Sequence, residues 1–366
     1  MKDIIQKILE IAVYAPSGDN SQPWKFVVKD NEIKIFNIPD RDNFYLNFRQ
    51  SGSYVAHGAL IENIVIVASQ NGYKADISLF PDSREPDLVA VVKLTQTNPT
   101  EERFYPFIKE RVTNRKPYEN KKLSEGQKRS FLNAPEEVGG GGKIILVDEE
   151  YKMKLIGEAS SAMEQIALET DFLHKLFFGD IVWTEEEEHE KKRGLYIKTM
   201  ELPAPAQILF KIIRYWPVMR IFNMLGFAKM VAKTNAKLYA SGGMFGAVVV
   251  DGDNSRDFIN AGRLTQRVWL KATKMKLGFH PVTGILFLAR RVMAGEAGKL
   301  SEAYIELIKK SHETIKSAFG VENSVIAMAF RVGNPRTQRA EQSSYDGYAD
   351  QQSASSSKLP PDIVFE

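Results

Sequence analysis

The sequence has no cysteine among its 366 residues. Disulfide bonds, cysteine-ligated zinc, iron–sulfur clusters and catalysis by a thiol are therefore excluded for this chain. The five histidines are not spaced as metal ligands, and we expect no metal site. The lack of cysteine agrees with a cytoplasmic location, which we expect because the first residues also show no signal-peptide pattern.

An excess of charge of one sign is also missing. The chain carries 49 basic and 46 acidic residues, so its formal net charge is only +3. So small a net charge does not steer a protein toward nucleic acid, and we expect no nucleic-acid partner. Hydrophobic residues make up 43% of the sequence, an ordinary fraction for a globular protein with a sizeable core.

Long apolar runs are absent as well. No stretch reaches the roughly 18 uncharged apolar residues that a membrane-spanning helix needs. The nearest approach is Leu202–Val231, which is interrupted by Lys211, Arg214, Arg220 and Lys229. Such a segment could lie on a membrane surface, but we interpret it as a helical cover over the protein's own core and do not expect a membrane partner.

The chain opens with a predicted helix, a loop and a strand. Residues 4–13 place apolar side chains at helical spacing, and Pro16 and Gly18 end the helix. A strand is predicted at Lys25–Val28. Trp24, directly before this strand, is expected to anchor the core rather than to stack on a ligand.

The loop between this helix and this strand is crowded with hydrogen-bonding side chains. Ser17, Asn20 and Gln22 lie within six residues of one another. Asn and Gln each present donors and an acceptor on a short stem, which suits them to the polar edge of a flat heteroaromatic ring. A polar turn with an Asx-type cap is the alternative interpretation.

Helices and strands are both predicted over the rest of the chain, whose first half should be helices packed on a small sheet; with the motifs described below, the prediction is a mixed α+β fold. Further strands are predicted at 32–38, 77–80, 88–94, 143–147, 246–250 and 324–332, and further helices at 54–69, 123–132, 258–277 and 300–319. The 54–69 helix is apolar around most of its circumference, so it should be buried between layers. Residues 151–234 are predicted to be a long helical insert that covers another part of the protein.

A basic segment, Arg111–Tyr118, precedes the 123–132 helix. Arg111, Thr113 and Arg115 are spaced two residues apart. Two guanidinium groups and a hydroxyl can together bind several phosphate oxygens. A solvated basic loop is the alternative interpretation of this segment.

Two predicted helices share a faint repeat. Each has glycine, leucine and alanine in the same order, with the same spacing from leucine to alanine: Gly58, Leu60 and Ala68 in one, and Gly262, Leu264 and Ala272 in the other. This pattern is weak support for an internal duplication.

Together these motifs resemble the nitroreductase family of flavoproteins. The order helix, Pro-Ser-x-x-Asn-x-Gln-Pro-Trp, strand resembles the family's loop that holds the isoalloxazine ring of FMN. The segment beginning at Arg111 resembles its phosphate anchor, and Pro281 and Gly284 match the segment that lies over the flavin N5 edge, where Thr283 replaces the commoner acidic residue. The resemblance therefore implies FMN as cofactor and NAD(P)H as co-substrate.

The order of the two motifs is inverted relative to the family, in which the phosphate anchor comes first. Family members are homodimers with FMN between the subunits. The resemblance, closest to the Acg-like branch, therefore implies a nitroreductase-like fold in which two similar halves are fused into one chain that mimics the homodimer. We expect the halves at 1–100 and 101–337, with the insert at 151–234, and a flexible C-terminal tail at 338–366, whose apolar end, 359–365, could dock back.

The resemblance assigns the cofactor site to a defined set of residues: Ser17, Asn20, Gln22, Arg111, Thr113, Arg115, Pro281 and Gly284. Arg336, Arg339 or Lys358 could assist at the phosphate, and His280 is a further candidate contact to flavin or substrate. No catalytic side chain is expected, because the flavin carries the redox chemistry.

Two functions follow from the resemblance. The first is an NAD(P)H-dependent FMN oxidoreductase that reduces a small acceptor, such as a nitro-aromatic compound or a quinone. The second is a protein that binds or sequesters flavin with little turnover, in which the insert forms a lid over the nicotinamide site. A fused internal dimer could act as a monomer.

Overall fold

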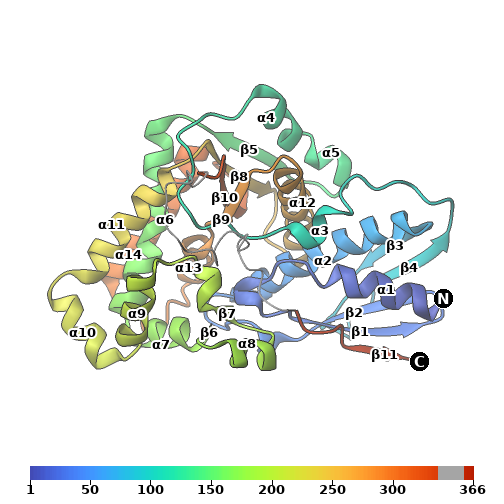
Figure 1. The fold of residues 1–366 in the computed structure, drawn as a ribbon, viewed down its shortest axis with the longest axis horizontal. Coiled ribbons are helices and arrows are strands. Elements are labelled where there is room, and N and C mark those ends of the chain that lie inside the picture. Colours follow the sequence, from blue (N-terminus) through green and yellow to red (C-terminus); the bar gives the residue numbers. More distant parts are fainter. Residues whose placement is uncertain (337–357) are drawn as a thin grey trace, which may run out of the picture.

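The computed structural model of the protein describes residues 1–336 and 358–366 and shows a mixed α+β architecture, as predicted (Figure 1). Two sheets each pack against one of two long central helices, α2 (Ser51–Gln70) and α12 (Ser255–Lys274). The remaining helices cover mainly the second sheet and one end of the molecule. Arg339 and the predicted tail residues 338–357 lie outside the described part of the chain.

The first sheet has the strand order β11-β1-β2-β4-β3. Its strands are β1 (Trp24–Lys29), β2 (Glu32–Asn37), β3 (Tyr73–Leu79), β4 (Leu88–Gln96) and β11 (Ile363–Phe365). Alternate residues of β1, namely Trp24, Phe26 and Val28, are buried, as expected for a strand with one covered face. Trp24 therefore serves as the predicted core anchor. The sheet lies against α2 and α1 (Lys2–Ala12).

The second sheet is antiparallel, with the order β5-β8-β10-β9. Its strands are β5 (Lys143–Val147), β8 (Met244–Val250), β9 (Gly278–Pro281) and β10 (Val325–Gly333). Every residue of β8 is buried, because α12 and the helices of the insert cover its two faces. The sequence did not predict β9, whose four residues are too few to show a strand period.

Further helices are distributed along the second half of the chain: α3 (Phe107–Glu110), α4 (Glu125–Leu132), α5 (Ala134–Val138), α6 (Glu150–Glu169), α7 (Asp171–Gly179), α8 (Glu185–Lys191), α9 (Ala204–Ile213), α10 (Trp216–Met224), α11 (Phe227–Ala240), α13 (Gly284–Met293) and α14 (Glu302–Phe319). The insert is helical as predicted, except for a pair of two-residue strands, β6 (Ile181–Val182) and β7 (Leu195–Tyr196). Of the described residues, no helix is both long enough and apolar enough to cross a bilayer.

The backbones of α2 and α12 touch where two glycines meet. A Cβ atom at Gly58 would lie 2.0 Å from the carbonyl oxygen of Ile259, and one at Gly262 would lie 2.0 Å from that of Val55. The contact is reciprocal, since each glycine faces the residue three positions before the other. The two glycines of the sequence repeat are therefore the crossing point of the two helices.

Polar side chains reinforce the same helix pair. Glu62, which is fully buried on α2, forms ion pairs with Arg263 and Arg267 of α12. At the neighbouring position of α2, Gln266 Nε2 donates to Asn63 Oδ1 over 2.7 Å. A buried carboxylate needs such partners, since its desolvation is costly. These bonds fix the rotation of one helix against the other.

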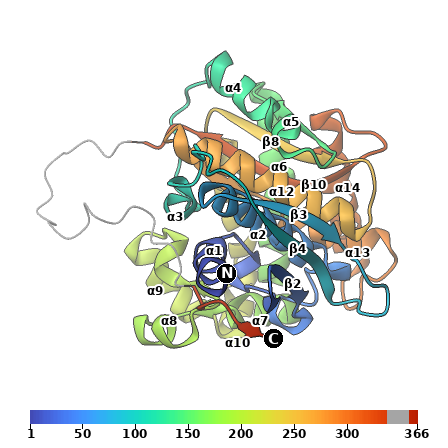
Figure 2. The ribbon, with the colours of Figure 1, turned by 90° about the vertical axis from the view of Figure 1, so that its right-hand side faces the viewer.

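The described end of the chain returns to the first half. Ile363–Phe365 pair in parallel with Phe26–Val28, which places the C-terminal strand beside the N-terminal helix (Figures 1 and 2). The apolar end that was expected to dock back does so. Lys358 and Leu359, which precede this strand, reach the loop before β1.

Substitution of Gly262 by alanine should destabilise the protein by about 3 kcal/mol or more, because a methyl group cannot enter the backbone contact with Val55. Chemical denaturation measures the loss. Gly126→Ala is the matched control, since the nearest atom to its Cβ would be the hydroxyl of Ser124 at 3.9 Å. Alanine should stabilise that exposed helical position slightly. Equal stability of the two variants would contradict the role assigned to the crossing.

Candidate functional site

The backbone of the loop after α1 has an unusual conformation. Asp19, Asn20 and Gln22 have φ angles of 44°, 57° and 50°, which are left-handed values that cost non-glycine residues about 1 kcal/mol or more each. Ser17 Oγ accepts a hydrogen bond from the backbone N–H of Gln22 over 3.0 Å. In the structure, the side chain of Ser17 therefore shapes the loop.

Gln22 is fully buried, and its side-chain amide forms hydrogen bonds with other parts of the protein. Its Nε2 donates to the carbonyl oxygens of Asn20 and Lys192, and its Oε1 accepts from the N–H of Leu359 over 2.9 Å. The side chain thus ties the loop to the insert and to the C-terminal segment. It does not line the cavity described next, whereas Ser17 and Asn20 do.

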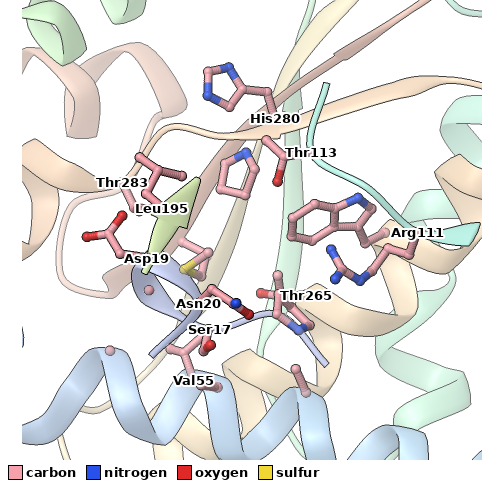
Figure 3. Close-up of a pocket in the computed structure, with 18 of the residues that line it drawn as sticks. Ser17, Asp19, Asn20, Val55, Arg111, Thr113, Leu195, Thr265, His280 and Thr283 are labelled. Carbon is pink, nitrogen blue, oxygen red and sulfur yellow. The ribbon is translucent and has the colours of Figure 1, made fainter. Parts of the chain in front are cut away.

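A cavity of about 280 Å³ lies beside the crossing of α2 and α12 (Figure 3). Its lining comes from the 16–20 loop, α2, the 111–115 segment, α12, the 280–283 segment, the insert and Lys358. Val55, Ala56 and Ala59 of α2 form an apolar wall of small side chains. Segments far apart in the sequence therefore meet at one place.

Three cationic side chains, Arg111, Arg115 and Lys358, line this cavity. Arg111 is 8% exposed, and its guanidinium lies 4.3 Å from the ring centre of Trp269 and donates to the carbonyl oxygen of Tyr14 over 3.1 Å. Its Nε has no hydrogen-bond partner among residues 1–336 and 358–366. Burial lowers the pKa of Arg111 to about 10.

Lys358 is another of these three cations. Its Nζ donates to Asn20 Oδ1 over 2.8 Å and to the carbonyl oxygen of Ala15 over 3.1 Å. Burial, followed by the charge of Arg111, lowers its pKa to about 7, with Glu188 acting in the opposite direction. Within the described residues neither Arg111 nor Lys358 forms an ion pair with a carboxylate. This part of the cavity therefore attracts an anion.

The rest of the basic segment is tied to the insert. Arg115 Nη1 donates to the carbonyl oxygen of Thr199 over 2.9 Å, and the backbone N–H of Arg115 donates to Glu201. Thr113 and Arg115 both line the cavity, as does Thr199. The 111–115 segment is thus ordered protein structure rather than a solvated loop.

A buried arginine on β10 positions the 115–116 backbone and His280 beside this cavity. Arg331, 1% exposed, donates to the carbonyl oxygens of Arg115 and Lys116 and, through Nε, to His280 Nδ1 over 3.0 Å. Burial and the charges of Arg331 and Arg115 lower the pKa of His280 well below its usual value. His280 is therefore neutral, and because Nδ1 accepts a hydrogen bond, its proton is on Nε2. It lines the cavity (Figure 3).

Pro281 and Thr283 also line this cavity, whereas Gly284 begins α13 and lines a second, adjoining cavity of about 250 Å³. A Cβ atom at Gly284 would lie 2.9 Å from Met163 Cγ. The glycine thus allows α13 to approach α6 closely.

The second cavity is acidic. Burial raises the pKa of Asp19 to about 6, and the charge of Asp180 contributes to this rise. Burial likewise raises the pKa of Asp42 and of Glu164 to about 7, although Asp42 accepts hydrogen bonds from Asn43 and Ser53, and Glu164 accepts one from Tyr239. Asp19 lines both cavities, so one cavity is cationic and its neighbour carries titratable carboxyl groups.

Sequence reasoning missed several residues of the site. Trp269, Thr265 and Leu195 line the first cavity, and Asp42 and Glu164 line the second. None of them belongs to a recognisable motif. Of the C-terminal candidates, Lys358 lies in the cavity lining, whereas the exposed Arg336 donates to the carbonyl oxygen of Tyr118 instead.

No family model matches the chain. An uncharacterized protein of Mycobacterium tuberculosis is 24% identical over 287 residues, which are 77% of this chain and 39% of that protein. Acg of the same organism, provisionally named as an NAD(P)H nitroreductase, is 26% identical over 84 residues, 23% of this chain and 25% of Acg. The chain thus spans well under half the length of the curated relatives it matches. The similarity to nitroreductases that the motifs predict is confirmed by such relatives.

Solved nitroreductases align with the chain at low structural similarity. An FMN-dependent nitroreductase from Clostridium difficile has a TM-score of 0.35 and 15% identity, covering 65% of this chain and 93% of its own. NfnB from Mycobacterium smegmatis, solved with NADPH, has a TM-score of 0.35 and 12% identity, covering 63% and 86%.

The acidic cavity predicts a pH-dependent stability. Asp42 has a higher pKa in the folded protein than its ordinary 3.8, so its contribution to stability is complete below about pH 4 and is lost as the pH rises toward 7. Asp42→Asn should therefore be more stable than the parent at pH 8, by on the order of 1 kcal/mol, and the difference should shrink toward pH 4. Thermal unfolding across this pH range measures it.

Asp40→Asn, at an exposed position just before this carboxyl, is the matched control. It should leave the pH dependence of unfolding as it is in the parent. A constant stability difference between Asp42→Asn and the parent at all pH values would contradict the predicted linkage.

Proposed function

We propose that this protein binds FMN and passes reducing equivalents from NAD(P)H to a small acceptor, such as a nitro-aromatic compound or a quinone. The observation that carries the proposal is the pair of cations, Arg111 and Lys358, which share one cavity with no carboxylate partner within the described residues. A buried, unneutralised arginine is costly, and a bound phosphate removes that cost.

The residues present fit FMN. The Nε of Arg111, which has no partner in the described part of the chain, and the ammonium of Lys358 would hold the phosphate, with the hydroxyl of Thr113 in the same lining. The apolar side chains of Val55 and Ala56, which are small, would lie against the ring. When bound, FMN supplies the hydride chemistry, which no side chain of the protein can supply.

The remaining predicted residues orient the cofactor or shape its loop. Asn20 lines the cavity and supports Lys358 through its Oδ1, while Ser17 and Gln22 hold the left-handed loop in place. Neutral His280 offers its Nε2 proton to a ring or substrate acceptor. Gln22 thus acts through the loop it positions, and not through direct contact.

We further propose that the chain is a fused dimer, with residues 1–100 and 101–337 as its two halves and one FMN between them. The reciprocal crossing of Gly58 and Gly262 supports this, because equal patches that contact each other are typical of two-fold interfaces. The distribution of the cavity lining over both halves supports it as well.

The second candidate is a flavin-binding protein with little turnover, in which the insert is the lid. Three contacts favour it: the carbonyl oxygen of Lys192 accepts from Asn20 and Gln22, Leu195 and Thr199 line the cavity, and Glu201 accepts from Arg115. The insert thus contacts the 16–22 loop and the 111–115 segment and forms part of the cavity wall, as a lid would.

Anaerobic titration with NADH and then NADPH separates the two candidates. Prompt bleaching of the visible flavin absorbance of a yellow protein is the expected result for the oxidoreductase, because reduction of the bound flavin removes this absorbance. A yellow protein that bleaches only with dithionite supports the lidded alternative. A colourless protein that takes up no added FMN would rule out both.

Arg111→Gln should weaken FMN binding about tenfold or more, because it removes a desolvated charged contact to the phosphate. The free variant should be at least as stable as the parent, since an uncompensated buried charge is removed. Flavin fluorescence titration and thermal unfolding without flavin measure the two effects. Exposed Arg256→Gln is the control for both. A variant that is less stable yet binds FMN normally would assign Arg111 a purely structural role.

A further inference from the structure

The helices α9, α10 and α11 lie in a stretch of uniform charge. From residue 202 to residue 250 the chain has no acidic residue, although the protein as a whole is nearly balanced at 49 basic and 46 acidic residues. All charged side chains of this stretch are basic: Lys211, Arg214, Arg220, Lys229, Lys233 and Lys237. Each of them is exposed.

The same helices expose large apolar side chains. Of the fourteen large hydrophobic residues exposed within the described part of the chain, half lie between residues 208 and 230: Ile208, Ile212, Tyr215, Ile221, Met224, Leu225 and Met230. Met224 and Leu225, at the turn between α10 and α11, are 83% and 84% exposed. An apolar surface of this kind marks an interaction site. We call these seven side chains and the six basic ones the α9–α11 face.

The exposure is not a failure of these helices to pack. Ile213, Met219 and Ala228, one from each helix or its end, are fully buried in a core shared with α7. On α9, Ile208 and Ile212 lie one helical turn apart on the opposite, outer side. Each helix therefore has an inner apolar side that packs and an outer side that has no partner within the described residues.

The α9–α11 face lies at one end of the molecule. In Figure 1 the three helices form the left-hand end, with α10 at its tip, on the side away from both chain ends. Figure 2 likewise shows α9 and α10 at the margin of the molecule. A flat partner can therefore approach this end without contacting the two sheets.

We propose that the α9–α11 face docks on the surface of an anionic phospholipid bilayer. Apolar side chains of medium size surrounded by lysine and arginine are the pattern of helices that lie in the headgroup region, where the apolar groups enter the acyl boundary and the cations pair with phosphates. A second copy of this chain fits less well, because two such faces would bring six positive charges on each side into opposition.

Co-sedimentation with vesicles tests the proposal on the full chain. Binding to vesicles of phosphatidylcholine and phosphatidylglycerol should be at least about tenfold tighter than binding to phosphatidylcholine alone, and should weaken as salt screens the cations. No preference for the anionic vesicles would overturn the proposal.

Two variants separate the parts of the face. Met224→Ser combined with Leu225→Ser should weaken binding to anionic vesicles about tenfold or more, as should Lys229→Glu combined with Lys233→Glu. Leu132→Ser and Arg256→Glu, at exposed positions on α4 and α12, are the matched controls and should bind as the parent does.

Thermal unfolding checks that the four substituted positions, all exposed, leave the fold intact. Sedimentation velocity without lipid tests the competing interpretation, in which the face is an interface between two copies of the chain. A dimer of the parent that Met224→Ser with Leu225→Ser dissociates, together with unchanged lipid binding of that variant, would show that the face is an interface between copies of this chain and would overturn the bilayer assignment.

Discussion

The contact between the backbones of α2 and α12 is the constraint on which the rest of this structure depends. Each helix packs against one sheet, so the distance between the two helices sets the distance between the two sheets. Gly58 and Gly262 reduce that distance to its minimum, because no side chain separates the helices there. Val55 and Thr265, one turn from the crossing on either helix, line the cavity. The width of the site therefore follows from the absence of two side chains.

Electrostatics divides the interior that this crossing creates. Arg111 and Lys358 make one cavity attractive to an anion, whereas Asp42 and Glu164 place titratable carboxyl groups in the next. Asp19 belongs to both. Bringing buried charges of like sign together is costly, so each cavity lowers the stability of the folded protein. A ligand with a negative group at one end and a neutral, polar body would offset the cost in the cavity that contains Arg111 and Lys358.

Local patterns made the α+β class and most helices and strands predictable, including the 143–147 strand at its observed ends. The glycine repeat indicated a relation between two helices, but only the fold shows that Gly58 and Gly262 touch. The burial of Gln22 was not predictable, since its partners Lys192 and Leu359 are far away in sequence. Likewise the outer side of α9–α11 was interpreted as a cover over the core, because periodicity identifies an apolar side without showing what lies against it.

The position of Lys358 has a consequence for biosynthesis. Translation produces Asn20 long before Lys358, yet Lys358 Nζ and Asn20 Oδ1 lie 2.8 Å apart in the folded protein. The anion-attracting part of the cavity is complete only when both are present, and β11 pairs with β1 beside it. This part of the cavity can therefore form only after Lys358 and β11 have been translated, so that a product truncated before Lys358 would carry the loop without its second cation.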